Sequence, residues 1–283
     1  MDAGTFMLIL AWGVFVGIVF SAIGAAGGIL TSFGLITLFG VLDPNSVKPM
    51  TQLVVLATAL VFVPEYLRNR ALVLPLGLLL GGGGLIGAFL GSTLSSLYLS
   101  DMQSFRPLFG MLTLAIAMQI FWKLARQFAA PIQQNGNVPP GLGGVSDLAI
   151  NLRAVTFQYA GRAYRVPVWS PLLAGLIIAM TASVFGVGGG FLLVPYMASV
   201  LGMPMHIIPA TAAIAIFMSL AVSIGNFLRL GAPLDWGLLV PLIVGAVIGA
   251  LAGPRINKAM KNNWLQVAMA LIVGGIGMKY TIF

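Results

Sequence analysis

Cysteine is absent from the 283 residues of this chain, and charged residues make up only 7% of it. Without a thiol, the chain can form neither a disulfide nor a thiolate metal site. Soluble domains carry about 25% charged residues, so a soluble fold is excluded. The chain also has a single histidine. A membrane-embedded enzyme needs a buried nucleophile, base or metal cluster, and this composition offers little material for one.

Apolar sequence is what the chain has instead, with 59% hydrophobic residues. Long apolar stretches cover residues 6–40, 49–66, 71–99, 105–122, 166–201, 204–229, 232–253 and 263–281. A membrane-spanning helix needs about 20 such residues. The strands of an outer-membrane barrel would instead alternate apolar and polar residues. We therefore predict an all-α polytopic membrane protein. The net charge is +8, and the basic residues that cause it lie in short loops. They are expected to orient the protein in the membrane, not to bind nucleic acid.

Two glycine clusters interrupt these apolar stretches. Gly186-Val187-Gly188-Gly189-Gly190 places four glycines in five positions, and each costs about 1 kcal/mol in a helix interior. The cluster predicts a helix break with exposed backbone N–H groups, followed by a restarted helix whose N-terminus attracts anions. Irregular backbone persists within a membrane only where protein buries it or where it lines a polar cavity.

The chain contains an internal repeat. Gly24-Ala25-Ala26-Gly27-Gly28-Ile29-Leu30 matches the segment from Gly186 to Leu192 at a constant offset of 162. Broken helices in corresponding positions of two halves point to a transporter's binding site; the alternative is close packing of small residues. A second glycine series, Gly83, Gly87 and Gly91, matches Gly245, Gly249 and Gly253. Its GxxxG spacing predicts helix packing and no ligand role.

We divide the chain into a first transmembrane repeat (1–123), a cytoplasmic polar linker (124–165) and a second transmembrane repeat (166–283). Near the end of the linker, aromatic and polar residues alternate around Ala160-Gly161, which is typical of a β-hairpin. If each glycine-broken segment is a re-entrant helical hairpin followed by three transmembrane helices, the repeats are inverted. One membrane face then collects ten of the 14 Lys and Arg residues, against nine if the repeats are parallel. The positive-inside rule favours the inverted arrangement.

Three segments of the chain resemble the TauE/SafE permeases, also called sulfite exporters. They are Gly186-Val187-Gly188-Gly189-Gly190-Phe191-Leu192-Leu193-Val194-Pro195, its partner near Gly24, and Gly231-Ala232-Pro233-Leu234-Asp235-Trp236. The resemblance covers nearly the whole chain. It implies transport of small sulfur-containing anions, such as sulfite, sulfoacetate or other organosulfonates, across a prokaryotic cytoplasmic (inner) membrane. The first half departs from the pattern at Ala25-Ala26 and at Phe33, which stands where the second half has Pro195.

The predicted function is a secondary transporter that holds its anion at the facing glycine breaks near mid-membrane. Candidate substrate-binding residues are Gly24, Gly27, Gly28, Gly186, Gly188, Gly189, Gly190, Ser21, Ser183, Thr51, Gln52 and Thr211. The alternative for each serine and threonine is a bond to the i−4 carbonyl of its own helix. The Gln52 amide, with two donors to satisfy, is harder to explain in that way.

Charge at the site is expected to be absent, because ionisable residues lie at or beyond the ends of the apolar stretches. Arg68 and Arg229 are candidates for drawing anions into a vestibule at each face; the alternative is snorkelling to the headgroups. We expect no cofactor, no metal and no catalytic residue. The expected partners are a small-molecule anion and the lipid bilayer, with no nucleic acid and with a homodimer left open.

Three other functions remain open from the sequence. A passive anion channel would share the same pore-lining groups, and saturable or gradient-dependent transport would distinguish the carrier from it. A membrane enzyme is poorly supported by the composition. A non-transporting assembly or sensor protein would use residues 123–165 as a docking module.

Overall fold

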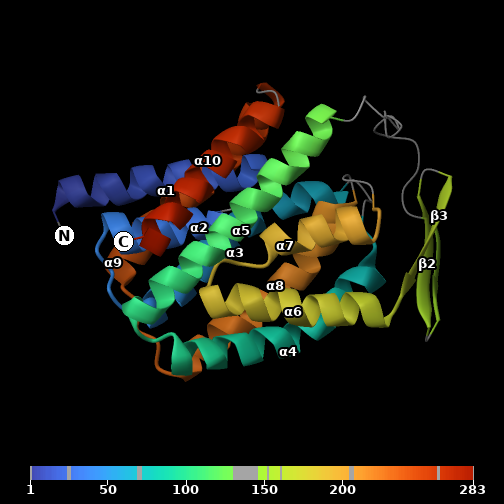
Figure 1. Ribbon diagram of the computed structural model, residues 1–283, viewed down its shortest axis with the longest axis horizontal. Helices are drawn as coiled ribbons and strands as arrows, with labels where there is room; N and C mark the ends of the chain where they lie inside the picture. Colours follow the sequence, from blue (N-terminus) through green and yellow to red (C-terminus); the bar gives the residue numbers. More distant parts are fainter. Residues whose placement is uncertain are drawn as a thin grey trace.

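The computed structural model describes residues 2–23, 27–68, 72–129, 146–151, 153–159, 161–203, 207–259 and 262–282. It is a helical bundle with a small sheet at one end (Figure 1). The first half contains a long helix, a short helix that continues as a π-helix, and three further long helices. These elements are α1 (Ala3–Ile23), α2 (Gly27–Phe33), η1 (Gly34–Leu38), α3 (Pro44–Arg68), α4 (Leu74–Tyr98) and α5 (Met102–Ala129).

The second half has the same order of elements after the sheet. They are α6 (Trp169–Phe185), α7 (Gly190–Pro195), η2 (Tyr196–Val200), α8 (Ile208–Arg229), α9 (Trp236–Ala259) and α10 (Asn262–Ile282). Each half thus begins with a helix that breaks at a glycine cluster and restarts, as the sequence predicts. Four helical segments in the described part of the chain are long and apolar enough to cross a membrane: Ala3–Ser21, Leu74–Tyr98, Met102–Trp122 and Ala210–Arg229.

The repeat extends to individual hydrogen bonds where the short arms end. Gly40 and Gly202, which are 162 positions apart, both have positive φ, at 69° and 62°. Equivalent backbone hydrogen bonds flank these glycines. The N–H groups of Phe39 and Leu201 donate to Gly34 O and Tyr196 O, respectively. Those of Val41 and Met203 donate to Leu35 O and Met197 O. A conformation that favours glycine therefore ends both arms in the same way.

The glycine series outside the breaks packs helices of one repeat on helices of the other. A Cβ atom on Gly83, Gly87 or Gly91 of α4 would overlap the backbone of α6 at Leu172, Leu176 or Met180. Likewise Gly245 and Gly249 of α9 lie against the backbone of α1 at Leu10 and Val14. These contacts join α4 to α6 and α1 to α9. The prediction of GxxxG packing is confirmed, because only a residue without a side chain permits so close an approach.

The sheet consists of β1 (Ser146–Ile150), β2 (Ala154–Tyr159) and β3 (Arg162–Pro167), paired antiparallel in that order. Strands β2 and β3 form a hairpin around Gly161, whose φ is 74°. Val155, Phe157 and Val166 of the sheet bury their side chains with Val73 at the start of α4. The sequence analysis did not include β1, and it ended the fourth apolar run at residue 122, seven residues before α5 ends at Ala129.

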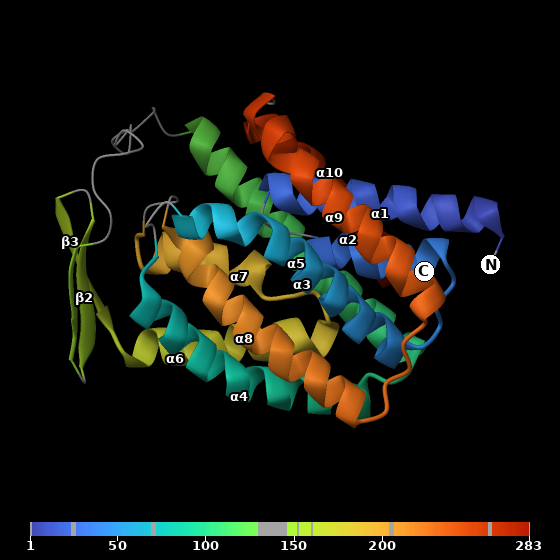
Figure 2. The same ribbon diagram turned by 180° about the vertical axis from the view of Figure 1, so that it is seen from behind.

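The two halves begin at opposite ends of the bundle. In Figure 1 the N-terminus of α1 lies at the left, whereas β3, which leads into α6, lies at the right. Seen from behind, α8 runs beside α4 (Figure 2), and the two helices are in contact. Arg229 ends α8 with an exposed side chain, its guanidinium 5.4 Å from the centre of the Phe89 ring.

Candidate functional site

The two glycine breaks meet inside the bundle. Gly28, in the first turn of α2, lies so close to Val187 that a Cβ atom at position 28 would overlap the Val187 carbonyl group. Both residues belong to predicted break segments, and both are buried. At this pair the two predicted break segments are in direct contact.

The second break is a short turn-rich connection, residues 186–189, between α6 and α7. Gly186 ends α6 in the left-handed conformation, with φ 72°, and Gly188 has φ 77°. The first hydrogen bonds of α7 run from the N–H groups of Leu192 and Leu193 to Gly189 O. The N–H groups ahead of them, on residues 188–191, have no acceptor in the described part of the chain, as expected at a helix start.

Helix α3 lies along this connection. A Cβ atom on Gly186 would be 2.6 Å from Lys48 Cα, and one on Gly188 would be 3.0 Å from Val55 Cγ1. Residues at i, i+4 and i+7 share one helix face, so Gln52 is on the α3 face that meets the break. Gln52 is 0% exposed, and neither its Nε2 nor its Oε1 has a hydrogen-bond partner. An unpartnered buried amide costs free energy, so this glutamine indicates a place where a ligand or water binds.

Three buried hydroxyl side chains belong to the neighbouring elements α2, α3 and α6. The Thr51 hydroxyl is 3.0 Å from that of Ser32 on α2, and both side chains are fully buried. Ser183, near the end of α6, is also buried, with 2% of its surface exposed. Thr51 and Ser183 are among the residues predicted from the sequence, whereas Ser32 is not. The signal was available, since Ser32 is five residues after Gly27 in the restarted arm.

Other predicted residues have structural partners. Ser21 donates to Gly17 O at 2.8 Å, the back-bonding alternative. Thr211 donates to Ile207 O at 2.8 Å and accepts from Val73 N–H at 3.1 Å, so its hydroxyl is fully used at the start of α4. A Cβ atom on Gly27 would be 2.5 Å from the Phe20 ring. Gly24 and the side chain of Arg68 lie outside the described residues.

The expectation of a site without nearby charge is wrong, because Lys48 is fully buried beside the second break. Its ammonium group donates to Leu99 O at 2.7 Å, to Ser95 O at 3.3 Å and to Asn45 Oδ1 at 3.4 Å. It also lies 5.0 Å from the centre of the Phe105 ring. The sequence places Lys48 in a loop, but α3 begins at Pro44 and brings it into the bundle.

Lys48 links the break to the end of α4. Its carbonyl acceptors belong to the last turn of that helix, where a cation interacts favourably with the helix dipole. Ser95 in turn donates from its hydroxyl to Val184 O of α6 at 2.6 Å. The second break is therefore held between α3 and α4 by a buried network that carries one positive charge.

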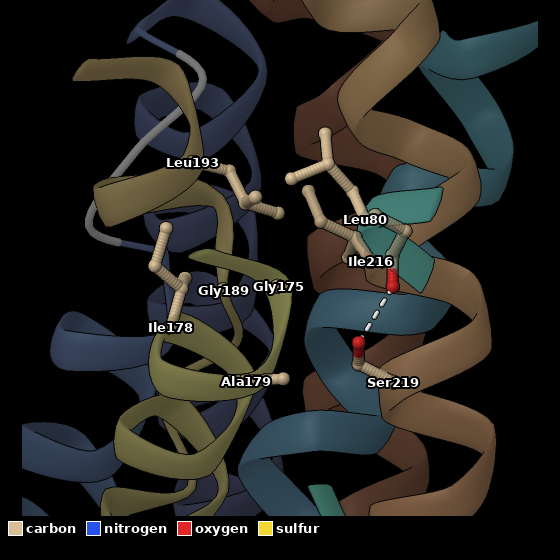
Figure 3. A pocket seen from close by; sticks show the side chains of 9 residues that line it. Leu80, Gly175, Ile178, Ala179, Gly189, Leu193, Ile216 and Ser219 are labelled. Carbon is tan, nitrogen blue, oxygen red and sulfur yellow. Dashed lines mark hydrogen bonds between the residues drawn. The ribbon is translucent and has the colours of Figure 1, made fainter. Parts of the chain in front are cut away.

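A small cavity lies on the other side of Gly189, between α4, α6 and α8 (Figure 3). Its side chains are mainly apolar, including Leu80, Ile178 and Leu193. The Ser219 hydroxyl in its wall donates to Ala215 O of its own helix at 2.7 Å. With no free polar group described in its lining, this cavity does not suit an oxyanion, and the side of the break that faces Gln52 suits one better.

A bundle of apolar helices with two facing breaks and a buried polar cluster has the architecture of a membrane transporter. Residues 9–280 match the family described as Sulfite exporter TauE/SafE, and the chain belongs to this family. It is also 24% identical to the probable membrane transporter protein YunE of Bacillus subtilis (strain 168), over 97% of either chain. No solved structure matches the chain significantly.

The chain is thus a multi-pass membrane transporter, as the resemblance implied, and not an enzyme. Its bacterial relative supports placement in a prokaryotic inner membrane.

Proposed function

We propose that this transporter carries small sulfur-containing anions, such as sulfite, sulfoacetate or other organosulfonates, and binds them beside Gln52 where the two glycine breaks meet. The observation that carries the proposal is the fully buried Gln52 amide with both ends unpartnered. A group of this kind is rare in a folded interior unless a ligand or water completes it.

The donors around Gln52 suit an oxyanion. The N–H groups of residues 188–191 and Gln52 Nε2 are available to donate, and Ser183 near the end of α6 adds a buried hydroxyl. Each hydrogen bond to a charged group contributes about 1.5–3 kcal/mol net, so three or four offset much of the cost of removing a small anion from water. The buried ammonium of Lys48, one helical turn from Gln52, adds a favourable potential without being a direct ligand.

The proposed arrangement in the membrane is a pair of inverted repeats with re-entrant hairpins. The opposite starting ends of α1 and α6 support it, as does the short length of each returning arm. The arm of α7 and η2, Gly190–Val200, rises only about 17 Å at 1.5 Å per residue, well short of a bilayer core of about 30 Å. Each hairpin would then carry its break into the membrane from a different face.

Uptake into proteoliposomes tests the proposed substrate class. Purified full-length protein should take up labelled sulfite with saturable kinetics, and excess unlabelled sulfite should compete whereas acetate should not. Uptake that rises linearly with concentration and shows no counterflow would indicate a channel. The absence of uptake for every sulfur anion tested would contradict the proposed substrate class.

A further inference from the structure

The Gln52 side chain has a hydrogen-bond acceptor, Oε1, as well as a donor, Nε2. The presence of this acceptor limits which anions can bind beside it. Its Nε2 carries two protons that can reach anion oxygens, whereas its Oε1 can only accept. Both atoms are buried and unpartnered, so exchanging the two ends of the amide leaves the same requirement. A bare oxyanion can satisfy Nε2 but has nothing to donate to Oε1.

The Lys48 and Thr51 side chains, which share helix α3 with Gln52, do not donate to its Oε1. The Lys48 ammonium has acceptors in Leu99 O, Ser95 O and Asn45 Oδ1. Thr51 is paired with Ser32 on the α2 side. Oε1 has no bond to any group in the described part of the chain, so a bound ligand or a water can supply its donor.

The charge of the Lys48 side chain further limits which ligands can bind. Lys48 is the one cationic side chain among the described residues that is fully buried, and it is at the second break. A single negative charge balances it, whereas a doubly charged anion leaves an uncompensated charge in a medium of low dielectric constant.

We infer that the site selects singly charged sulfur oxyanions that carry their own O–H or N–H donor, and that Gln52 Oε1 accepts from that donor. This inference rests on the proposed function and specifies its substrate class. Hydrogen sulfite in an S–OH form and α-hydroxysulfonates belong to the class. Sulfite dianion, sulfate dianion, sulfoacetate (a dianion at neutral pH) and simple alkanesulfonates lack the single charge, the donor or both, so the inference narrows the proposed substrate class.

Two probe anions isolate the effect of a hydrogen-bond donor on the ligand. Sulfamate and methanesulfonate have the same charge and nearly the same shape, but sulfamate has an NH₂ group where methanesulfonate has a CH₃ group. Titration calorimetry with the purified full-length protein should give tighter binding of sulfamate by about tenfold to a hundredfold, the range that corresponds to one unsatisfied buried acceptor.

The variant Gln52→Met removes the amide while keeping an unbranched side chain of similar length. Sulfamate should then bind no better than methanesulfonate. Gln103→Met, at an exposed glutamine in α5, serves as the matched control and should preserve the wild-type ratio.

The outcomes are distinct. Equal affinity of the wild-type protein for the two probes overturns the inference but leaves an anion site in place. A preference that persists in Gln52→Met overturns the assignment to Gln52. Binding of neither probe, together with no uptake of sulfite or sulfoacetate, overturns the proposed function itself. The wild-type ratio requires no mutant, so a variant that fails to fold still leaves the inference tested.

Discussion

Gly28 and Val187 lie 159 positions apart in the sequence, yet the Cα of Gly28 faces the Val187 carbonyl with no room for a Cβ atom between them. Each residue belongs to one of the two glycine breaks. Their contact brings the breaks together at a single place in the bundle, beside the α3 face that carries Lys48, Gln52 and Val55. Any change that forces the breaks apart should therefore alter the site that we propose between them.

Gly28→Ala should abolish transport. Its new methyl group would overlap backbone atoms of Val187, which cannot move away as a flexible side chain can. Initial rates of sulfite uptake in proteoliposomes measure the effect. Gly225→Ala is the matched control, because nothing lies within 4 Å of a Cβ atom at that position of α8. Wild-type rates in Gly28→Ala would show that close contact of the breaks is not needed.

Gly83→Ala should destabilise the fold by about 1–3 kcal/mol or more, the cost of overpacking, because the methyl group would overlap Leu172 O of α6. The neighbouring Gly82→Ala meets only a Leu172 methyl carbon at 3.8 Å and should be neutral or stabilising. Thermal unfolding in detergent compares the two variants. Equal melting temperatures would contradict the packing role assigned to the GxxxG series.

Lys48→Met should weaken both stability and anion binding. It removes the cation that holds Leu99 O and Ser95 O, and charged hydrogen bonds of this kind contribute about 1.5–3 kcal/mol each. It also removes the positive potential next to the break. Thermal unfolding and calorimetric affinity for sulfamate report the two effects. Lys279→Met, at an exposed position near the end of α10, should change neither. A stable Lys48→Met protein with unchanged affinity would remove Lys48 from the account.

Cysteine labelling tests the inverted arrangement, and the absence of native cysteine makes single-cysteine variants straightforward. Ala163→Cys in β3 and Asn262→Cys at the start of α10 should react with an impermeant maleimide from the cytoplasmic side. Asp101→Cys, between α4 and α5, should react from the opposite side. Labelling of Ala163→Cys and Asn262→Cys from different sides would show that the repeats are not arranged in this way.

Much of the architecture could be predicted from local signals. The offset of 162 between the glycine clusters reflects a repeated backbone, and the structure reproduces it in the hydrogen bonds beside Gly40 and Gly202. The GxxxG series predicted its packing role because helices approach closely only where side chains are absent. The end of α5 and strand β1 could not be predicted, because they lie in a polar segment that lacks strong periodicity.

The composition of the candidate site was harder to predict, because it depends on contacts between distant segments. A lysine four residues after Pro44 resembles a loop residue, and only the fold shows that the end of α4 receives its ammonium. Thr211 has the same residue type as its repeat mate Thr51, yet one bonds within its own helix and to α4 while the other pairs with Ser32. Residue type identified the candidates, and tertiary packing separated them.

The position of a bound anion would show where this transporter holds its substrate. Selenite is a heavier analogue of sulfite, and selenium scatters X-rays anomalously, so crystals of the full-length protein grown with selenite would locate it. The account predicts an anomalous peak within hydrogen-bonding range of the Gln52 amide, between Gly28 and the segment 186–190. A peak only beside Arg229 at the bundle end, with nothing between the breaks, would contradict it.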